Sequence, residues 1–272
     1  MKRNYIWNVL LIVSACVFLF CVWNLGSYYY DSYKVKSEND ALAEKFEKAK
    51  AEQTASPTPT TKPQVSEEPT SSPEPKVLPI FDDLLKECKD IVGWIKIDDT
   101  DISYPVVQTE NNTDYCRTLI DGKTKDNHGV IFVDYQSDVF KPSTNIIIYG
   151  HNMRDGTMFA QLHDYKEKSF YKKHKIIEFD TLYEEAEYEI VSVALTQIAT
   201  EETKDDFHYY TFFNAKNEKE FNEFYDNMKK LQLYDTGVKA KYGDTFISLS
   251  TCSKHVDGGR LVVFAKKITD EK

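Results

Sequence analysis

The order of hydrophobic and polar positions divides the chain into an apolar N-terminus, a polar middle and a long globular part. Residues 5–25 are almost entirely apolar, and a lysine and an arginine precede them. About 20 such residues span a bilayer, and positive charge before the span favours a cytoplasmic N-terminus at residues 1–4. Because no Ala-x-Ala-like cleavage site follows, we predict an uncleaved, single-pass signal anchor in the cell membrane, with the rest of the chain extracytoplasmic.

One alternative for the N-terminus is a lipoprotein signal. Residues 13–16, Val-Ser-Ala-Cys, resemble a lipoprotein cleavage box. A mature lipoprotein would turn polar after this cysteine, whereas residues 17–23 stay strongly apolar. We therefore favour the anchor over a removed signal.

The polar middle has two parts. Residues 26–53 are rich in Lys, Glu and Ala with little apolar periodicity, which predicts a charged juxtamembrane helix that is solvated at best. Residues 54–76 hold six of the nine prolines in a Thr/Ser/Glu mixture that cannot bury a core. In an extended form, at ~3.1 Å per residue, this linker would reach roughly 70 Å and hold the following domain away from the membrane.

Residues 77–272 have the pattern of one mainly β domain. They open with apolar residues at the i, i+3, i+4, i+7 spacing of a one-sided helix over 79–88. A second helix is predicted over 217–231, where Asn217 and Glu220 resemble a cap with a reciprocal carboxylate. Eight short β-branched and aromatic runs predict strands at 94–97, 102–107, 129–133, 145–149, 176–179, 188–195, 245–249 and 261–268. This spacing predicts an antiparallel barrel or sandwich.

Composition narrows the class of partner. The formal net charge is −10 and the isoelectric point about 5.2, so no nucleic-acid partner is expected, because such a partner calls for a basic face. Only four of the 34 basic residues are arginines. Lysine is therefore the generic cation, and an arginine at position 260 hints at a task for a rigid, permanently charged group.

The five cysteines have different surroundings. No CxxC or Cys/His pair at ligand spacing occurs, so we predict no metal site and no cofactor. Cys16 and Cys21 belong to the apolar N-terminus and are expected to pack in the membrane. Cys88 and Cys116 are compatible with two core thiols or with one disulfide. Cys252 is left as the odd thiol, in polar surroundings.

The stretch from 244 to 267 reads as strand, loop and strand, with two adjacent glycines in the loop. If its strands pair antiparallel, Cys252 and Arg260 fall opposite each other, and opposed Cβ atoms lie about 4.5–5.5 Å apart. A thiol is a nucleophile only as a thiolate, which a neighbouring cation or base favours. A buried, inert cysteine remains the alternative at this point.

His151 follows an apolar strand and a glycine in the run Tyr149-Gly-His-Asn-Met. The glycine lets the backbone turn sharply and places the imidazole at a strand end. Taken alone, His151 would be an ordinary surface histidine. Together with Cys252 and Arg260 it completes a nucleophile, an acid/base and an electrophilic stabiliser, a combination consistent with acyl transfer.

Several segments resemble one family. The runs Leu249-Ser-Thr-Cys252 with Arg260 eight residues on, and Tyr149-Gly-His-Asn-Met, are similar to the signatures of sortases, the cysteine transpeptidases of the Gram-positive cell surface. The segment from Val92 to Tyr115, the run Gly129-Val-Ile-Phe-Val-Asp-Tyr135 and the long insertion with a helix near 217–231 resemble class B sortases. The resemblance covers essentially all of residues 78–268.

The resemblance implies an eight-stranded sortase-type β-barrel with an N-terminal helix and an inserted helix before the cysteine strand. It also implies an endopeptidase and transpeptidase mechanism. Cys252 would attack a Thr carbonyl in the C-terminal sorting motif of an exported protein, and His151 would protonate the leaving amine. An amine of a lipid II-type peptidoglycan precursor would then resolve the thioester, while Arg260 holds the motif backbone or the oxyanion.

The resemblance also assigns Asn112, Ser250 and Thr251 to substrate binding. Two positions depart from the family pattern: Cys116 stands where an aliphatic residue is expected, and Ser253 stands where an acidic residue can occur. Both departures bear on substrate contacts more than on the reaction.

Two other functions compete with this interpretation. Another extracellular cysteine acyl-transferase, such as an L,D-transpeptidase, would carry a Ser-x-Gly-Cys-x-Arg-like motif, which the run from Ser250 to Ser253 lacks. A non-catalytic surface binding domain on a stalk would have an inert Cys252.

Overall fold

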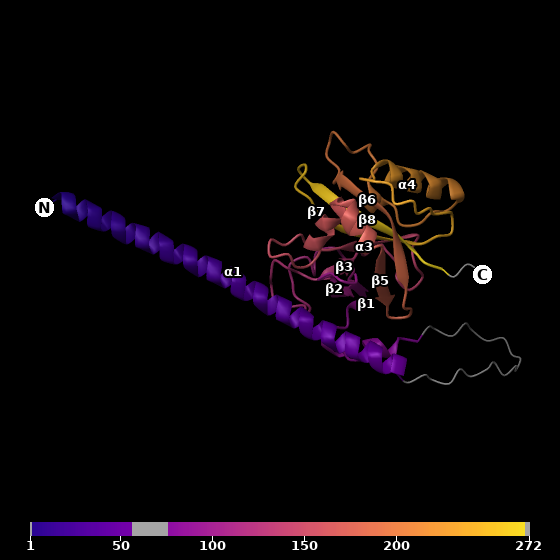
Figure 1. The fold of residues 1–272 in the computed structure, drawn as a ribbon, viewed down its shortest axis with the longest axis horizontal. Coiled ribbons are helices and arrows are strands. Elements are labelled where there is room, and N and C mark those ends of the chain that lie inside the picture. The colour runs from indigo at the N-terminus through magenta and orange to yellow at the C-terminus, as the bar shows by residue number, and fades with distance from the viewer. Residues whose placement is uncertain (1, 56–75, 270–272) are drawn as a thin grey trace, which may run out of the picture. The chain divides into compact units, whose positions relative to one another are not determined.

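The computed structural model describes residues 2–55 and 76–269 and divides into two compact units, Met1–Ala41 and Leu42–Lys272 (Figure 1). The predicted linker, 54–76, lies almost wholly outside the described residues. Both of its ends belong to the second unit. The expected role of this segment as a spacer therefore stays a prediction.

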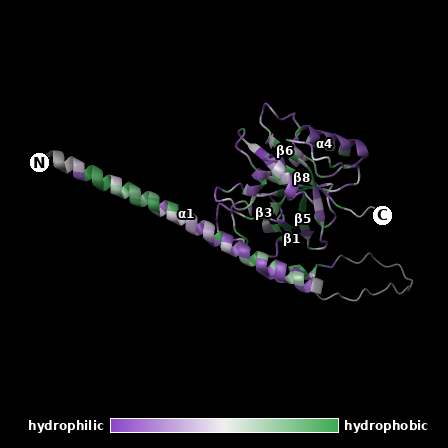
Figure 2. Ribbon diagram, viewed as in Figure 1, coloured by the Kyte–Doolittle hydropathy of each residue, from purple (hydrophilic) through white to green (hydrophobic). Residues whose placement is uncertain are grey.

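Helix α1 (Lys2–Ala55) begins with the apolar stretch, which Figure 2 shows in green. Its most apolar 18-residue window has a mean hydropathy of 2.4 and is fully exposed. Within the described residues this is the one helix long and apolar enough to cross a membrane. Its length and composition are compatible with the predicted anchor.

The last turns of α1 belong to the second unit. Leu42 and Phe46 are buried there, and the ring of Phe46 stacks on Trp94 with centroids 4.6 Å apart. Lys50 forms ion pairs with Glu178 and Asp180 at 3.0 and 2.8 Å. The expectation of a solvated helix was therefore wrong for these turns, because two apolar residues four apart make a face of their own among the charges.

The second unit is a closed barrel with the strand order β1-β2-β3-β4-β7-β8-β6-β5, which confirms the predicted eight-stranded fold. The strands are β1 (Ile91–Lys96), β2 (Ser103–Val107), β3 (Ile131–Val133), β4 (Asn145–Tyr149), β5 (Ile176–Thr181), β6 (Glu187–Gln197), β7 (Phe246–Cys252) and β8 (Gly259–Lys267). The helices are η1 (Pro79–Phe81), α2 (Leu84–Glu87), η2 (Ala160–Lys166), α3 (Lys168–Lys173), η3 (Tyr209–Thr211) and α4 (Glu218–Lys230). The helix predicted over 79–88 is thus split into η1 and α2.

Two neighbouring pairs in the barrel are parallel, β2 with β3 and β4 with β7. The expected all-antiparallel pairing was wrong at these two places, because long connections return the chain to the end where the earlier strand began. The parallel pair β4 and β7 brings two strand ends that are about 100 residues apart in the sequence to the same end of the barrel. The candidate histidine and cysteine follow or end these two strands.

Side chains of alternating residues fill the barrel and cover its outer face. Ile146, Ile148 and Leu249 belong to the interior cluster. The outer face of β4, β7 and β8 is covered by apolar residues from α4 and from the segment before it, of which three are aromatic and one is a methionine: Tyr209, Phe221, Phe224 and Met228. Because the interior is filled and this outer face is covered, the ends of the strands are the positions where a site can form.

Candidate active site

Cys252 and Arg260 are directly opposed as the last residue pair of the antiparallel β7 and β8, as the register predicted. The thiol is exposed. The guanidinium donates from Nη1 to the carbonyls of Gly258 at 3.3 Å and Gly259 at 3.0 Å. Within the described chain no carboxylate forms an ion pair with Arg260, so its charge is available to a developing anion.

The parallel pairing of β4 and β7 brings His151 to the same place. Tyr149 pairs with Ser250, and the Gly150 amide donates to the Ser250 carbonyl at 3.1 Å, so the pairing runs past the end of β4. Two residues further on, His151 reaches the level of Cys252. Because side chains alternate along a strand, Cys252 lies on the outer face of β7, like Ser250.

Gly150 makes this approach possible. A Cβ at this position would lie 2.5 Å from side-chain carbons of both Ile131 and Phe159. These residues belong to the interior cluster, so any side chain here would displace the strand end that carries the imidazole.

The orientation of the His151 ring is set by one hydrogen bond. Its Nε2 lies 2.6 Å from the backbone carbonyl of Cys116. A carbonyl only accepts, so Nε2 carries a hydrogen, and Nδ1 is the ring nitrogen left for proton transfer. The Cys116 thiol, which is free, lies 3.6 Å from the same Nε2. Cys88 is also free, which leaves these two residues as separate thiols.

The backbone carbonyl of Cys252 is held from the loop that follows His151. The Asn152 side chain donates to it at 3.0 Å, and Nε2 of His163 lies 2.9 Å from it. The same Nε2 lies 2.9 Å from the Asn152 amide nitrogen, and burial lowers the pKa of His163. Sequence reasoning missed Asn152 and His163, because nothing local shows that their loop returns to the cysteine strand.

Ser250, predicted to bind substrate, is buried beneath the site. Its Oγ shares a 2.6 Å hydrogen bond with the hydroxyl of Tyr209. Burial raises the pKa of Tyr209 to about 12, against the opposing effects of this bond and of the Arg260 charge. A contact of Ser250 with substrate stays a prediction, and its observed partner is Tyr209.

Asn112 and Thr251 have other surroundings. Asn112 donates to the Asp134 carboxylate at 2.9 Å and accepts from the backbone amide of Tyr135 at 3.0 Å. The same carboxylate accepts from the hydroxyl of Tyr149 at 3.0 Å. Thr251 lies on the opposite face of β7 from the thiol, and its buried hydroxyl has no hydrogen-bond partner in the described part of the chain. Their roles in substrate binding also stay predictions.

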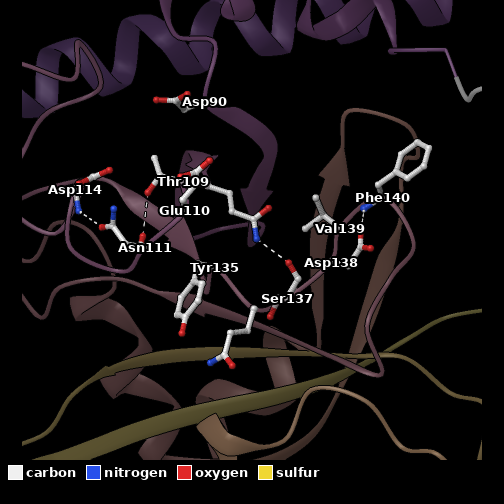
Figure 3. A pocket seen from close by; sticks show the side chains of 12 residues that line it. Asp90, Thr109, Glu110, Asn111, Asp114, Tyr135, Ser137, Asp138, Val139 and Phe140 are labelled. Atoms are coloured by element: carbon white, nitrogen blue, oxygen red, sulfur yellow. Dashed lines mark hydrogen bonds between the residues drawn. The ribbon is translucent and has the colours of Figure 1, made fainter.

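A separate cavity of about 780 Å³ lies beside the end of β2 and the loop after β3. Figure 3 shows its side chains, which include four carboxylates, those of Asp90, Glu110, Asp114 and Asp138. None of the three candidate catalytic residues lines it. Within the described residues, 2–55 and 76–269, no group of three or more His, Cys, Asp or Glu side chains could hold a metal ion.

Comparison with known proteins finds similarity to sortases. The family model described as "Sortase domain" matches residues 95–268. Sortase B of Staphylococcus aureus is 37% identical over 194 residues, which cover 71% of this chain and 76% of that protein. Sortase B of Listeria monocytogenes is 31% identical over 269 residues, 98% of each chain.

Solved structures agree with the sequence matches. A Staphylococcus aureus sortase B–substrate complex superposes with a TM-score of 0.72 at 30% identity, covering 88% of this chain and 99% of that one. Sortase B of Clostridium perfringens superposes with a TM-score of 0.61 at 28% identity, covering 69% of this chain and 98% of that one. The similarity extends over the whole barrel.

Proposed function

The chain belongs to the sortase family, in its class B, and on that premise we propose that it cleaves a C-terminal sorting motif of exported proteins after a Thr residue and transfers the product to a peptidoglycan amine. The observation that carries this proposal is the convergence of two pairings. The β7–β8 register sets Cys252 opposite Arg260, and the parallel β4–β7 pair brings the segment of His151 to the same end of the barrel.

In the first half of the proposed reaction, the Cys252 thiolate attacks the Thr carbonyl carbon. The carbonyl electrons move to oxygen, and the Arg260 guanidinium stabilises the oxyanion or holds the motif backbone. His151 donates a proton from Nδ1 to the leaving amine as the C–N bond breaks, which leaves a thioester on Cys252. The bond from Nε2 to the Cys116 carbonyl leaves Nδ1 as the ring nitrogen for this proton transfer.

In the second half, an amine attacks the thioester carbonyl and His151 accepts its proton at Nδ1. The C–S bond breaks, a new amide forms and the Cys252 thiolate is released. Water can take the place of the amine, in which case the same site acts as an endopeptidase. Matched structures of sortase B include a substrate complex and a complex with triglycine, which supports a peptide substrate and an amine acceptor for this chain.

The location of the reaction is part of the proposal. The apolar stretch of α1 would cross the cell membrane, and the positive charge before it favours an N-terminus inside. The catalytic unit would then face exported proteins and lipid II-type precursors outside. The stalked binding domain considered above finds no support, because an exposed thiol opposite a guanidinium that has no carboxylate partner in the described chain is a poor structural cysteine.

The test uses the full-length chain in detergent with fluorogenic peptides built on Asn/Ser/Pro-Pro-x-Thr-like motifs and a soluble amine. We expect cleavage after Thr and a new amide that contains the amine. Cys252→Ala abolishes both products, and His151→Ala lowers turnover by about 10²–10⁴-fold, the range for a lost general acid/base. Cys21→Ala, which removes a thiol from the apolar helix, is the matched control and retains full activity. Cleavage by Cys252→Ala would rule out the assigned nucleophile.

A further inference from the structure

His128 is a buried histidine that the proposed reaction does not use. It is 3% exposed. Its Nδ1 lies 2.5 Å from an oxygen of Asp126, and its Nε2 lies 2.8 Å from an oxygen of Asp155. Ionised carboxylates only accept hydrogen bonds, so both ring nitrogens donate and the ring is an imidazolium.

The charge state of His128 follows from its two partners. Burial alone would lower its pKa, but the hydrogen bonds and negative charges of Asp155 and Asp126 outweigh burial and raise the pKa above its ordinary value. Asp126 lies two residues before His128, whereas Asp155 comes from a different loop. The imidazolium therefore ties together two parts of the chain that are distant in sequence.

The first part supports the carbonyl that holds His151. Gly129, next to His128, has φ +58°, and a Cβ there would lie 2.6 Å from the backbone oxygens of Tyr115 and Cys116. The Val130 amide donates to the Tyr115 carbonyl at 3.1 Å. The segment of His128 thus packs against the carbonyl that receives the Nε2 hydrogen of the catalytic imidazole.

The second part is the loop that follows His151 itself. The Phe159 amide donates to the His151 carbonyl at 2.9 Å and closes the base of this loop. One oxygen of Asp155 accepts from both the backbone amide and the hydroxyl of Thr157, at 3.1 and 2.7 Å. The other oxygen bonds His128, so the carboxylate is fixed on both sides.

We propose that His128 is a positioning residue for the reaction, because it locks the loop of His151 onto the segment whose Cys116 carbonyl directs the His151 ring. This inference rests on the proposed function for its kinetic consequence. Cys252 and Arg260 are held by the β7–β8 ladder, so loss of the lock misplaces the acid/base and leaves the nucleophile and its cation in place. Misplacement by about 1 Å can cost about 10²-fold in rate.

The kinetic test compares His128→Ala and the milder Asp155→Asn with the full-length wild type in detergent, using a motif peptide that wild type cleaves. We expect kcat to fall by about 10–100-fold in each variant, with KM changed by less than about threefold. The double variant should lose no more activity than the worse single variant, because each single variant already removes the same His128–Asp155 contact. His174→Ala, which removes another partly buried, hydrogen-bonded histidine at the end of α3, should leave kcat unchanged.

A second readout separates this inference from the proposed function. In the chain labelled with ¹⁵N-histidine, NMR at a pH where the His151 ring is neutral should show its hydrogen on Nε2 in wild type and a mixture of the two neutral tautomers in His128→Ala and Asp155→Asn. If the wild-type chain turned over no peptide while the two variants still showed this change in His151, the proposed reaction would be overturned. The positioning of His151 by His128 would stand. Wild-type kcat in both variants, or a lower kcat with unchanged His151 signals, would overturn the positioning role.

Discussion

At the scale of single residues, the site depends on which nitrogens of Arg260 and His151 are left for substrate after their hydrogen bonds to the backbone are made. Arg260 donates from Nη1 to the carbonyls of Gly258 and Gly259. Its remaining N–H groups can donate to an incoming substrate group. His151 donates from Nε2 to the Cys116 carbonyl, which leaves Nδ1 for proton transfer. Each of these two proposed catalytic groups is therefore held through one nitrogen and offers another to substrate.

Arg260→Lys tests whether the fork matters. A lysine supplies one point charge and cannot bond two backbone carbonyls and a substrate oxygen in a single plane. We expect kcat/KM for a motif peptide to fall by more than about tenfold, which corresponds to about 1.4 kcal/mol of lost transition-state stabilisation. Steady-state kinetics on the folded variant provide the measurement. A rate near that of wild type would reduce Arg260 to a generic cation.

The raised pKa of His128 makes stability depend on pH. A group that binds its proton more tightly in the folded chain contributes fully below its unfolded pKa of about 6.5, and that contribution is lost as the pH rises through the raised folded pKa. The difference in urea midpoint between wild type and His128→Ala should therefore shrink as the pH rises above about 6.5. A difference that is constant over this range contradicts a buried imidazolium.

At the scale of elements, local patterns predicted the hairpin of β7 and β8 and helix α4. Asn217 caps α4 by accepting from the Glu220 amide at 3.0 Å, while the Glu220 carboxylate reaches the Lys216 amide instead of the cap residue's own amide. The parallel partnership of β4 and β7 was beyond such patterns, because a strand of isoleucines pairs equally well with many partners. The hydrogen bonds to the Cys252 carbonyl depend on that partnership.

The end of α1 offers a stability test at the same scale. Phe46 is 1% exposed and stacked on Trp94, so Phe46→Ala should lower the free energy of unfolding of the catalytic unit by about 3 kcal/mol. Tyr33→Ala is the matched control, because Tyr33 lies in the same helix with 73% of its surface exposed. Urea titration followed by tryptophan fluorescence measures both. Equal midpoints for the two variants would show that these turns do not pack on the barrel.

At the scale of the whole molecule, the chain combines an apolar helix that is compatible with a membrane anchor and a barrel of the sortase family. The motifs around Cys252, His151 and Arg260 predicted the family from the sequence, and the family match and the barrel topology confirmed it. The supporting shell of Asn152, His163 and His128 could not be predicted, since these residues meet the site only through the closed fold.

The most direct test of the proposed reaction is the intact mass of the full-length chain during incubation with a motif peptide and no added amine. We predict a transient adduct equal in mass to the peptide up to its Thr, removed by hydroxylamine and located on Cys252 by peptide mapping. The free Cys116 thiol beside His151 makes the location decisive. An adduct on Cys116, or none with any peptide that the chain cleaves, would contradict a Cys252 thioester.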